Sequence, residues 1–193
     1  MAELPSTKQL VNDIEYVSGI DEFFAAFSDA WGATTGQVLK LETRQIYKEP
    51  GNASLGAFLE GDVPLAIARL PDYRKGDLEL YADLERRNIE FIRCRPIVQP
   101  ITEYLRWELE CYRFNAKHGE KIYFLDRTDI FDTLALHDFI VFDRSVAVIH
   151  DYNEDGLLKG GWVTREEEKI DALASIFALV RVSAVSWMDY NLA

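Results

Sequence analysis

The spacing of hydrophobic residues divides the chain into short strands and longer helices that interleave. Leu39, Leu41 and Thr43 alternate with charged neighbours, and this period of two predicts a half-buried strand that ends near Tyr47. The same reasoning predicts further strands over residues 88–95, 122–125, 139–142, 146–149 and 157–163.

Apolar residues at helical spacing indicate the helices. Asp21 is predicted to be the N-cap of the first long helix, which ends at Thr34-Thr35-Gly36. Thr164, followed three residues later by Glu167, has the pattern of a capping box that opens the last helix. Other helices are predicted around 9–17, between Pro50-Gly51 and Gly61, over 77–87, and from 101 to just before Gly119.

Prolines interrupt two segments. The stretch 62–76 contains Pro64, Pro71 and Gly76, which predicts an irregular connection. Pro96 and Pro100 follow the strand at 88–95, so that strand is expected at a sheet edge or is expected to end there.

These elements predict one domain with a short extension. Residues 1–19 are a polar N-terminal lead-in, and residues 20–193 form a single domain. Because strands and helices interleave without an internal repeat, the fold class is α/β or α+β. A mixed sheet flanked by helices, with an antiparallel meander toward the C-terminus, is expected.

Composition and charge narrow the function classes. The 193 residues carry 21 lysines and arginines against 33 acidic residues, a net charge of −12. A field of this sign repels phosphate backbones, so direct nucleic-acid binding through bulk charge is not expected. No secretory signal or membrane-spanning run is apparent, and Cys94 and Cys111 form no CxxC pair. A cytoplasmic, reduced protein that engages no membrane is therefore predicted.

A histidine- and aspartate-containing patch is a candidate catalytic site. In the hairpin predicted from the strands at 139–142 and 146–149, His137 and Asp138 lie opposite His150 and Asp151 at the open end. Two imidazoles and two carboxylates can supply an acid/base pair or hold a divalent metal, and Asp143 at the tip is a further candidate. Adjacent strand residues point to opposite faces, so about two of the four are expected to converge.

The turn that follows this hairpin resembles half of a calcium loop. Asp151, Asn153, Asp155 and Gly156 match the alternating ligands and turn glycine of an EF-hand, but Trp162 stands where the bidentate glutamate belongs. Such Asx-rich turns are also common in plain hairpins. No metal or cofactor is predicted.

A basic strand face is the second candidate site. Arg93 and Arg95 share one face because they are two residues apart, and Arg106 and Glu108 lie on the helix that follows. Guanidinium groups match carboxylate and phosphate oxygens, so Arg93, Arg95, Arg106 and Glu108 are candidate ligand-binding residues. The alternative is structural, namely arginine–glutamate pairs that bridge the helix to the sheet.

Several strings carry a family resemblance. Arg86-Arg87-Asn88-Ile89-Glu90-Phe91-Ile92-Arg93-Cys94-Arg95-Pro96-Ile97 precedes Tyr104-Leu105-Arg106-Trp107-Glu108, and His137-Asp138-Phe139-Ile140-Val141-Phe142-Asp143 follows later. The chain resembles an actinobacterial family of proteins of unknown function, number 6879, from about Phe23 to about Phe177. Members are often encoded beside helix-turn-helix regulators, which implies an accessory or regulatory role. His137 departs from the pattern, because members more often carry asparagine or another polar residue there.

A second resemblance concerns the fold. The strand-helix-strand order and the segment from His137 to Ile149 resemble one half of a phospholipase D-like domain. Those enzymes need His-x-Lys-x4-Asp, but Phe139 stands at the lysine position and Arg144 at the aspartate position. Because a phenylalanine cannot hold a phosphate, the resemblance implies a degenerate relative without phosphodiesterase activity.

Three functions follow from these features. The favoured hypothesis is a non-catalytic binding or regulatory module that acts through a protein partner, such as a helix-turn-helix regulator. The first alternative is a small hydrolase or phosphodiesterase-like enzyme that uses His137, Asp138, His150 and Asp143. The second is a sensor of a small anionic ligand bound at Arg93, Arg95 and Arg106. Whether the protein forms a homodimer is left open by the sequence.

Overall fold

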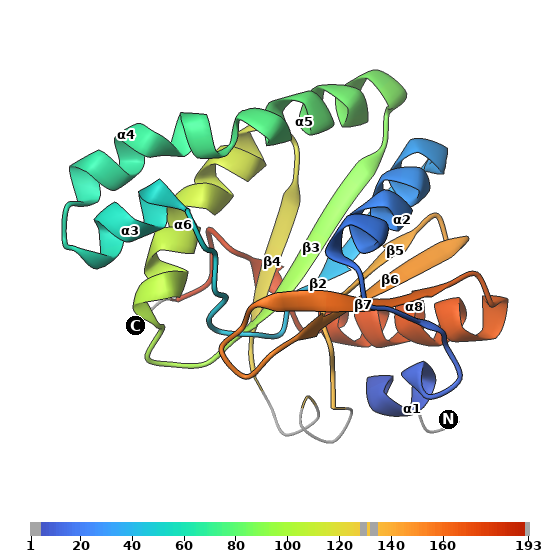
Figure 1. Ribbon diagram of the computed structural model, residues 1–193. Coiled ribbons are helices and arrows are strands. Elements are labelled where there is room, and N and C mark those ends of the chain that lie inside the picture. The colour runs from blue at the N-terminus through green and yellow to red at the C-terminus, as the bar shows by residue number, and fades with distance from the viewer. Residues whose placement is uncertain (1–4, 128–130, 132–134, 192–193) are drawn as a thin grey trace.

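The strands form one mixed sheet at the centre of the molecule. The computed structural model describes residues 5–127, 131 and 135–191. Within these residues the sheet order is β1-β7-β6-β5-β2-β3-β4-β8 (Figure 1). The strands are β1 (Tyr16–Val17), β2 (Gln37–Leu41), β3 (Glu90–Ile97), β4 (Lys121–Asp126), β5 (Phe139–Phe142), β6 (Val146–Tyr152), β7 (Leu158–Thr164) and β8 (Val185–Ser186).

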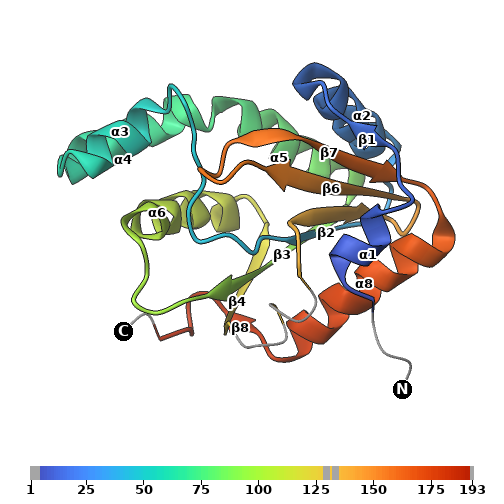
Figure 2. The ribbon, with the colours of Figure 1, turned by 60° about the horizontal axis from the view of Figure 1, so that its bottom comes forward.

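Helices cover both faces of this sheet. Figure 2 shows α2, α3, α4, α5 and α6 on one side of the strands and α1 and α8 on the other. The helices are α1 (Thr7–Val11), α2 (Ile20–Ala33), α3 (Ala53–Leu59), α4 (Val63–Tyr73), α5 (Lys75–Arg87), α6 (Glu103–Lys117) and α8 (Glu167–Val182). The predicted mixed α/β architecture is confirmed.

The sheet combines a parallel part and an antiparallel part. Strands β2, β3 and β4 are parallel, and the connections between them are α3 to α5 and then α6. The predicted meander of β5, β6 and β7 is antiparallel and joins the other side of β2. Strand β2 is therefore the point at which the strand order reverses.

Alternation along the strands gives each face its own core. On the α8 side, Leu41, Cys94 and Ile149 pack with Ile176 and other residues of α8. On the α2 side, Phe23 of α2 and Tyr81 of α5 cover strand residues of the opposite parity. The helix α6 continues that second face over β3 and β4 through a further apolar cluster.

Two expectations about proline are wrong. Residues 63–73 form the helix α4, because Pro64 lies in its first turn, where no backbone N–H is needed, and Asp62 accepts a hydrogen bond from Leu65 N. Pro96 lies inside β3, a central strand. The pairing of β3 with β2 runs only from Glu90 to Cys94, so Pro96 removes no hydrogen bond on that side.

The predicted helix caps also differ from the observed ones. The helix α2 begins after Gly19, which has no side chain to act as a cap, and Asp21 lies in its first turn, where a negative charge favours the helix dipole. The helix α8 has Glu166 at its N-cap. Thr164 Oγ1 accepts from Glu166 N at 3.1 Å, so the predicted capping box does not form.

The N-terminal lead-in packs against the domain. Leu10 and Val11 of α1 are buried in the α8-side core, and β1 pairs with β7 at the sheet edge. This pairing needs a glycine, because a Cβ on Gly160 would lie 2.2 Å from Val17 O. Within the described residues, no helix has the length and apolar character that a membrane crossing requires.

Candidate functional site

A polar pocket of about 250 Å³ opens on the α2 side of the sheet, beyond the carboxyl end of β2. We call it the tyrosine pocket, because four tyrosines are among its lining residues. The lining residues come from the ends of strands, from the loop after β2, from the α4–α5 junction and from α6: Lys40, Glu42, Tyr47, Lys48, Glu49, Tyr73, Arg74, Arg93, Tyr104, Glu108, Tyr152, Gly156 and Leu158.

The tyrosine rings form one continuous wall. Tyr47 packs against Tyr152 with ring centroids 5.2 Å apart and against Tyr104 at 5.7 Å. Trp107 joins Tyr104 to Tyr73, with both centroid distances at 5.6 Å. Burial raises the pKa of all four tyrosine hydroxyls, which therefore stay protonated and act as donors.

Glu49 accepts hydrogen bonds from two of these hydroxyls. Tyr73 Oη donates to Glu49 Oε2 at 2.6 Å, and Tyr104 Oη donates to Glu49 Oε1. Asn52 Nδ2 donates to Oε2 at 2.6 Å. The loop after β2 is thus tied to α4, α6 and the N-cap of α3 by a single carboxylate.

An ion-pair cluster forms the floor of the pocket. Arg93 Nη1 lies 2.6 Å and Lys40 Nζ 2.8 Å from Glu42 Oε1, while Arg95 Nη1 lies 3.1 Å from Oε2. Burial opposes ionisation of Glu42, but the attraction of Arg93, Lys40 and Arg95 outweighs it and holds the pKa of this carboxyl well below its usual range. Glu42 is therefore a permanent anion.

A second buried carboxylate, that of Glu120, also contacts Arg93 of the pocket floor. Arg93 Nε donates to Glu120 Oε1 at 2.5 Å, and Tyr81 Oη donates to Oε2 at 2.6 Å. Arg95 Nη1 and Tyr112 Oη also contact each other at 2.5 Å. Both arginines are thereby fixed in orientation, by carboxylates that lie just after β2 and just before β4 rather than on the helix α6.

One wall of the pocket contains a charged pair with a longer separation than the ion pairs of the floor. Arg74 Nη2 and Glu108 Oε1 are 3.7 Å apart, and the two side chains are 14% and 7% exposed. Burial raises the pKa of the Glu108 carboxyl, and nearby Glu42 adds to this effect, although Arg95 and Arg74 oppose it. The contact is charged but lacks a close hydrogen bond.

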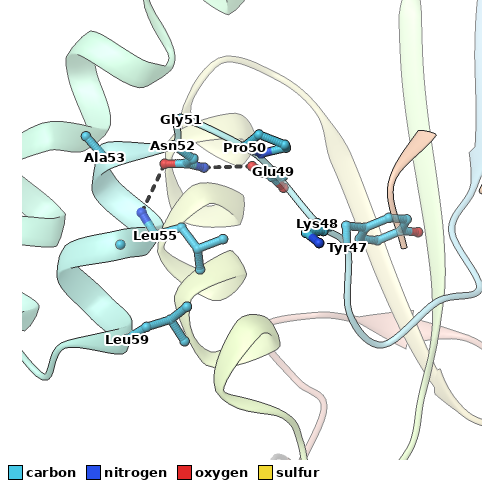
Figure 3. A pocket seen from close by; sticks show the side chains of 10 residues that line it. Tyr47, Lys48, Glu49, Pro50, Gly51, Asn52, Ala53, Leu55 and Leu59 are labelled. Carbon is cyan, nitrogen blue, oxygen red and sulfur yellow. Dashed lines mark hydrogen bonds between the residues drawn. The ribbon is translucent and has the colours of Figure 1, made fainter. Parts of the chain in front are cut away.

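The pocket shares its rim with a second hollow. Figure 3 shows the segment from Tyr47 to Asn52 facing Leu55 and Leu59 of α3, with Asn52 bonded to Glu49 and to Leu55 N. This more apolar hollow has a volume of about 510 Å³, and we call it the α3 groove. Tyr47, Lys48 and Glu49 line both cavities.

Three of the four predicted ligand-binding residues gather at the tyrosine pocket. Arg93 and Glu108 line it, and Arg95 lies beneath Tyr47 with its guanidinium 5.4 Å from the ring centroid. Arg106 does not: it lies on the exposed side of α6 and pairs with Glu103 at 3.3 Å. The expectation of a basic face next to Arg106 is wrong, because α6 turns Arg106 and Glu108 to different sides.

The histidine- and aspartate-containing patch is divided between the two faces of the sheet. His150 N donates to Asp138 O at 2.8 Å, which sets these two residues opposite each other on the pocket side. His137 packs on Trp162 of the other side, and its Nδ1 lies 2.9 Å from Thr7 Oγ1. His137 and His150 therefore do not meet.

The side chains of His137 and Asp138 have hydrogen-bond partners, whereas His150 Nδ1 is buried without one among the described residues. Asp138 accepts from Thr43 N at 2.7 Å and from Tyr47 Oη. Burial lowers the pKa of His150 to about 4 and also lowers that of His137. Both imidazoles are neutral at pH 7, and Asp138 extends the hydrogen-bond network of the tyrosine pocket toward β5.

Asp143 holds the strand ends together. Its carboxylate accepts from Gly36 N at 2.9 Å and Gln37 N at 2.6 Å, and also from Thr35 N. Although partial burial opposes it, these backbone donors lower the pKa of Asp143. The residue has φ +49°, a left-handed conformation that Asp and Asn tolerate, in the three-residue turn between β5 and β6. These contacts of Asp143 are with the backbone next to the turn, which is a structural role.

The predicted half calcium loop is a hairpin turn in the structure. Asn153 Oδ1 accepts from Leu157 N at 2.9 Å, and Asp151 pairs with Lys159 at 3.3 Å. Gly156, at φ +86°, lies against the backbone of Ile46. No cluster of metal-ligating side chains occurs within the ranges that the structure describes.

Comparison with known proteins places the chain in a family. Residues 25–192 match the family model described as domain of unknown function DUF6879. The chain belongs to this family. No curated protein matches its sequence. Within the DUF6879 match lie all the lining residues of the tyrosine pocket, whereas α1 and β1 precede it.

TrmBL2 is among the solved structures that match the chain at low identity. TrmBL2, an archaeal chromatin protein described as showing a novel mode of DNA binding, shares 13% identity with a TM-score of 0.47. The alignment covers 96% of the DUF6879 chain and 56% of TrmBL2, so this chain spans about half the length of that protein. A likeness at this level supports no inference about function.

Sequence reasoning missed most of the pocket. Tyr47, Tyr73, Tyr104 and Tyr152 come from four separate elements of the DUF6879 fold, and no local spacing connects them. Arg74 lies at the α4–α5 junction, which was expected to be irregular. One signal for the pocket is present in the sequence. The string beginning at Tyr104 carries the family resemblance, and its pocket residues are Tyr104 and Glu108, whereas Arg106 lies outside the pocket.

Proposed function

We propose that this chain is a non-catalytic binding module whose tyrosine pocket holds a small polar molecule. The observation that carries the proposal is the pocket itself, a polar cavity at the place where the strand order reverses beside β2. In open α/β sheets, ligands bind beyond the carboxyl ends of strands at such reversals. The volume of about 250 Å³ is below the range for drug-sized ligands, so the occupant is small.

The chemistry of the wall favours a hydrophilic occupant. Lys40 and Arg74 supply donors, the tyrosine hydroxyl oxygens offer lone pairs, and Glu49 and Glu108 supply further acceptors. Buried polar groups of this kind discriminate strongly against molecules that leave them unpaired. The pocket is therefore suited to selecting among small polar compounds.

Binding rather than catalysis fits the electrostatics of the floor. Glu42 is held ionised by Arg93, Lys40 and Arg95, which removes it as a proton carrier near pH 7. Burial raises the pKa of the Cys111 thiol to about 12, so it is not a nucleophile. Groups fixed in this way orient a ligand without exchanging protons with it.

A thermal-shift screen of small polar compounds tests this proposal. A compound that raises the unfolding midpoint of the wild-type protein is expected to act less on Tyr73→Phe and Tyr104→Phe, because each variant removes one pocket hydroxyl. Tyr123→Phe is the matched control, since Tyr123 lies on the α8 side of the sheet. Compounds that stabilise all four proteins equally, or none at all, would contradict a tyrosine-pocket ligand.

The module is further proposed to act through a protein partner. The α3–α4 hairpin extends from the body of the molecule in both views (Figures 1 and 2), and it exposes Leu59, Val63, Leu65 and Ile67. Exposed apolar residues grouped on one element are typical of a partner interface. The resemblance given above implies a helix-turn-helix regulator as that partner.

Direct titration tests the partner. The purified chain is titrated into a helix-turn-helix regulator of the kind that the resemblance implies, and binding is expected to weaken in Ile67→Glu. Val182→Glu is the control, because Val182 is exposed in the last turn of α8, on the opposite side of the sheet from α4 (Figure 2). Equal loss in both variants, or no binding by the wild type, would refute a partner site on α4.

A further inference from the structure

Arg74 is incompletely satisfied in the tyrosine pocket. Its Nη1 lies 2.8 Å from Asp77 Oδ2, but Nη2 is 3.7 Å from Glu108 Oε1. Its Nε is buried and has no hydrogen-bond partner among the described residues. The side chain is held over the Tyr73 ring, with 4.9 Å from Cζ to the centroid. The guanidinium is therefore positioned, with the Cys111 thiol as a further neighbour, while within the part of the chain that the structure describes its Nε has no hydrogen-bond partner and its Nη2 is only loosely paired.

Positive charge exceeds negative charge around the cavity. Four lysines and arginines line it against three glutamates, although the whole chain has a net charge of −12. Lys40 and Arg93 are neutralised by Glu42, but Glu108 lies beyond hydrogen-bond distance of Arg74. Of Lys40, Arg93 and Arg74, it is therefore Arg74 that has no carboxylate within hydrogen-bond distance among the described lining residues.

We propose that the occupant of the tyrosine pocket carries an oxyanion group, a carboxylate or a tetrahedral phosphate or sulfate, which binds Arg74 in competition with Glu108. This inference rests on the proposed function and specifies the ligand chemistry of the same site. A planar guanidinium matches two oxygens of such a group. When no anion is bound, Glu108 is the weaker partner of the Arg74 guanidinium.

Competition with Glu108 couples binding to protons. An anion at Arg74 is repelled by ionised Glu108 and accepted beside its neutral form, so affinity falls as the pH rises through the pKa of Glu108. Burial raises that pKa. The charged and titratable groups that face Glu108 come from β3, the strand ends, α4 and α6, and they are Arg95, Glu42, Tyr73, Arg74, Tyr104, Tyr112 and Cys111.

Inorganic sulfate is a suitable probe, because its charge is constant between about pH 4.5 and 9. The unfolding midpoint is measured with sodium sulfate and with sodium chloride at equal ionic strength. Sulfate also stabilises proteins by exclusion from their surface, so the informative quantity is the difference between variants. Arg74→Gln is expected to lose the specific part of the shift. Arg106→Gln, the same change on the exposed side of α6, is expected to keep it.

Glu108→Gln tests the competition itself. Sulfate affinity is expected to rise about tenfold at pH 8 and to lose its pH dependence, because the repelling charge is gone. Glu110→Gln, a change at a half-buried residue of α6 that pairs with exposed Arg113, is expected to behave as wild type. Acetate at equal ionic strength then distinguishes a carboxylate preference from a tetrahedral one.

The outcomes separate the inference from the proposed function. An equal sulfate shift in wild type and Arg74→Gln, or an unchanged pH dependence in Glu108→Gln, overturns the oxyanion inference. If neutral polar compounds bind the tyrosine pocket while sulfate and acetate do not, the inference fails and the proposed function stands. If no compound of either kind binds, both fail.

Discussion

Arg93 Nη1 donates to Glu42 Oε1 across 2.6 Å, and both side chains are less than one tenth exposed. The two residues are 51 positions apart in the sequence and meet because β2 and β3 are parallel neighbours. Breaking a buried pair leaves an uncompensated charge, which costs more than the pair contributes. A substitution in the pocket floor therefore tests both the pairing of β2 with β3 and the structure of the tyrosine pocket.

Glu42→Gln is expected to destabilise the protein by about 3–5 kcal/mol, because Arg93 and Arg95 both lose their buried counter-charge. Chemical denaturation followed by circular dichroism measures the change. Glu110→Gln provides the comparison, since the pair of Glu110 with Arg113 is on the surface and contributes about 1 kcal/mol or less. A similar small loss in both variants would show that Glu42 is not buried in an ion-pair cluster.

His150 is expected to make stability depend on pH in the mildly acidic range. Burial lowers its pKa from 6.5 to about 4, so the unfolded chain takes up a proton before the folded one does. Stability is then complete above about pH 6.5 and declines by up to about 3 kcal/mol as the pH falls toward 4. Denaturation midpoints at a series of pH values measure this slope. The slope should flatten in His150→Gln and persist in His118→Gln, and a slope identical in all three proteins would rule out His150 as its source.

Asp143→Ala is expected to lower stability by about 1–3 kcal/mol, because three backbone N–H groups at the start of β2 lose a charged acceptor. Asp143→Asn should cost less, since asparagine also tolerates φ +49° and keeps one acceptor oxygen. Thermal unfolding measures both. The sulfate response should be unchanged, because Asp143 lies outside the tyrosine pocket, and loss of that response without loss of stability would contradict a turn role.

Thr7→Val is expected to loosen α1 from the domain. The Thr7 hydroxyl donates to Ala135 O, and its oxygen accepts from His137 N at 2.9 Å, in a fully buried position. Leaving these groups unpaired costs about 1–3 kcal/mol. Hydrogen exchange over residues 5–17 should speed up in Thr7→Val, whereas Ser28→Ala, which removes an exposed hydroxyl on α2, should leave it unchanged. Unaltered exchange in Thr7→Val would mean that α1 is held by other contacts.

Local patterns predicted much of the secondary structure. The alternation around Leu39 and the helical spacing of the residues after Ile101 gave β2 and α6, because each pattern reports which side of a single element is buried. The same rules failed for α4, where prolines were treated as interruptions although Pro64 occupies a position that tolerates it. For Pro96 they allow a sheet edge or a strand end; β3 is a central strand that ends at Ile97, and the sequence does not show how far β2 extends alongside it.

The sequence by itself determined the mixed α/β class, the acidic charge and the fact that Arg93 and Arg95 share a strand face. Only the tertiary structure decided what those arginines contact, since Glu42 and Glu120 reach Arg93 from 51 and 27 positions away. It also turned Arg106 to the surface, separated His137 from His150 and brought four tyrosines around one cavity. The physical reason is that periodicity fixes the direction of a side chain within its own element, whereas a site depends on which elements become neighbours and in which register.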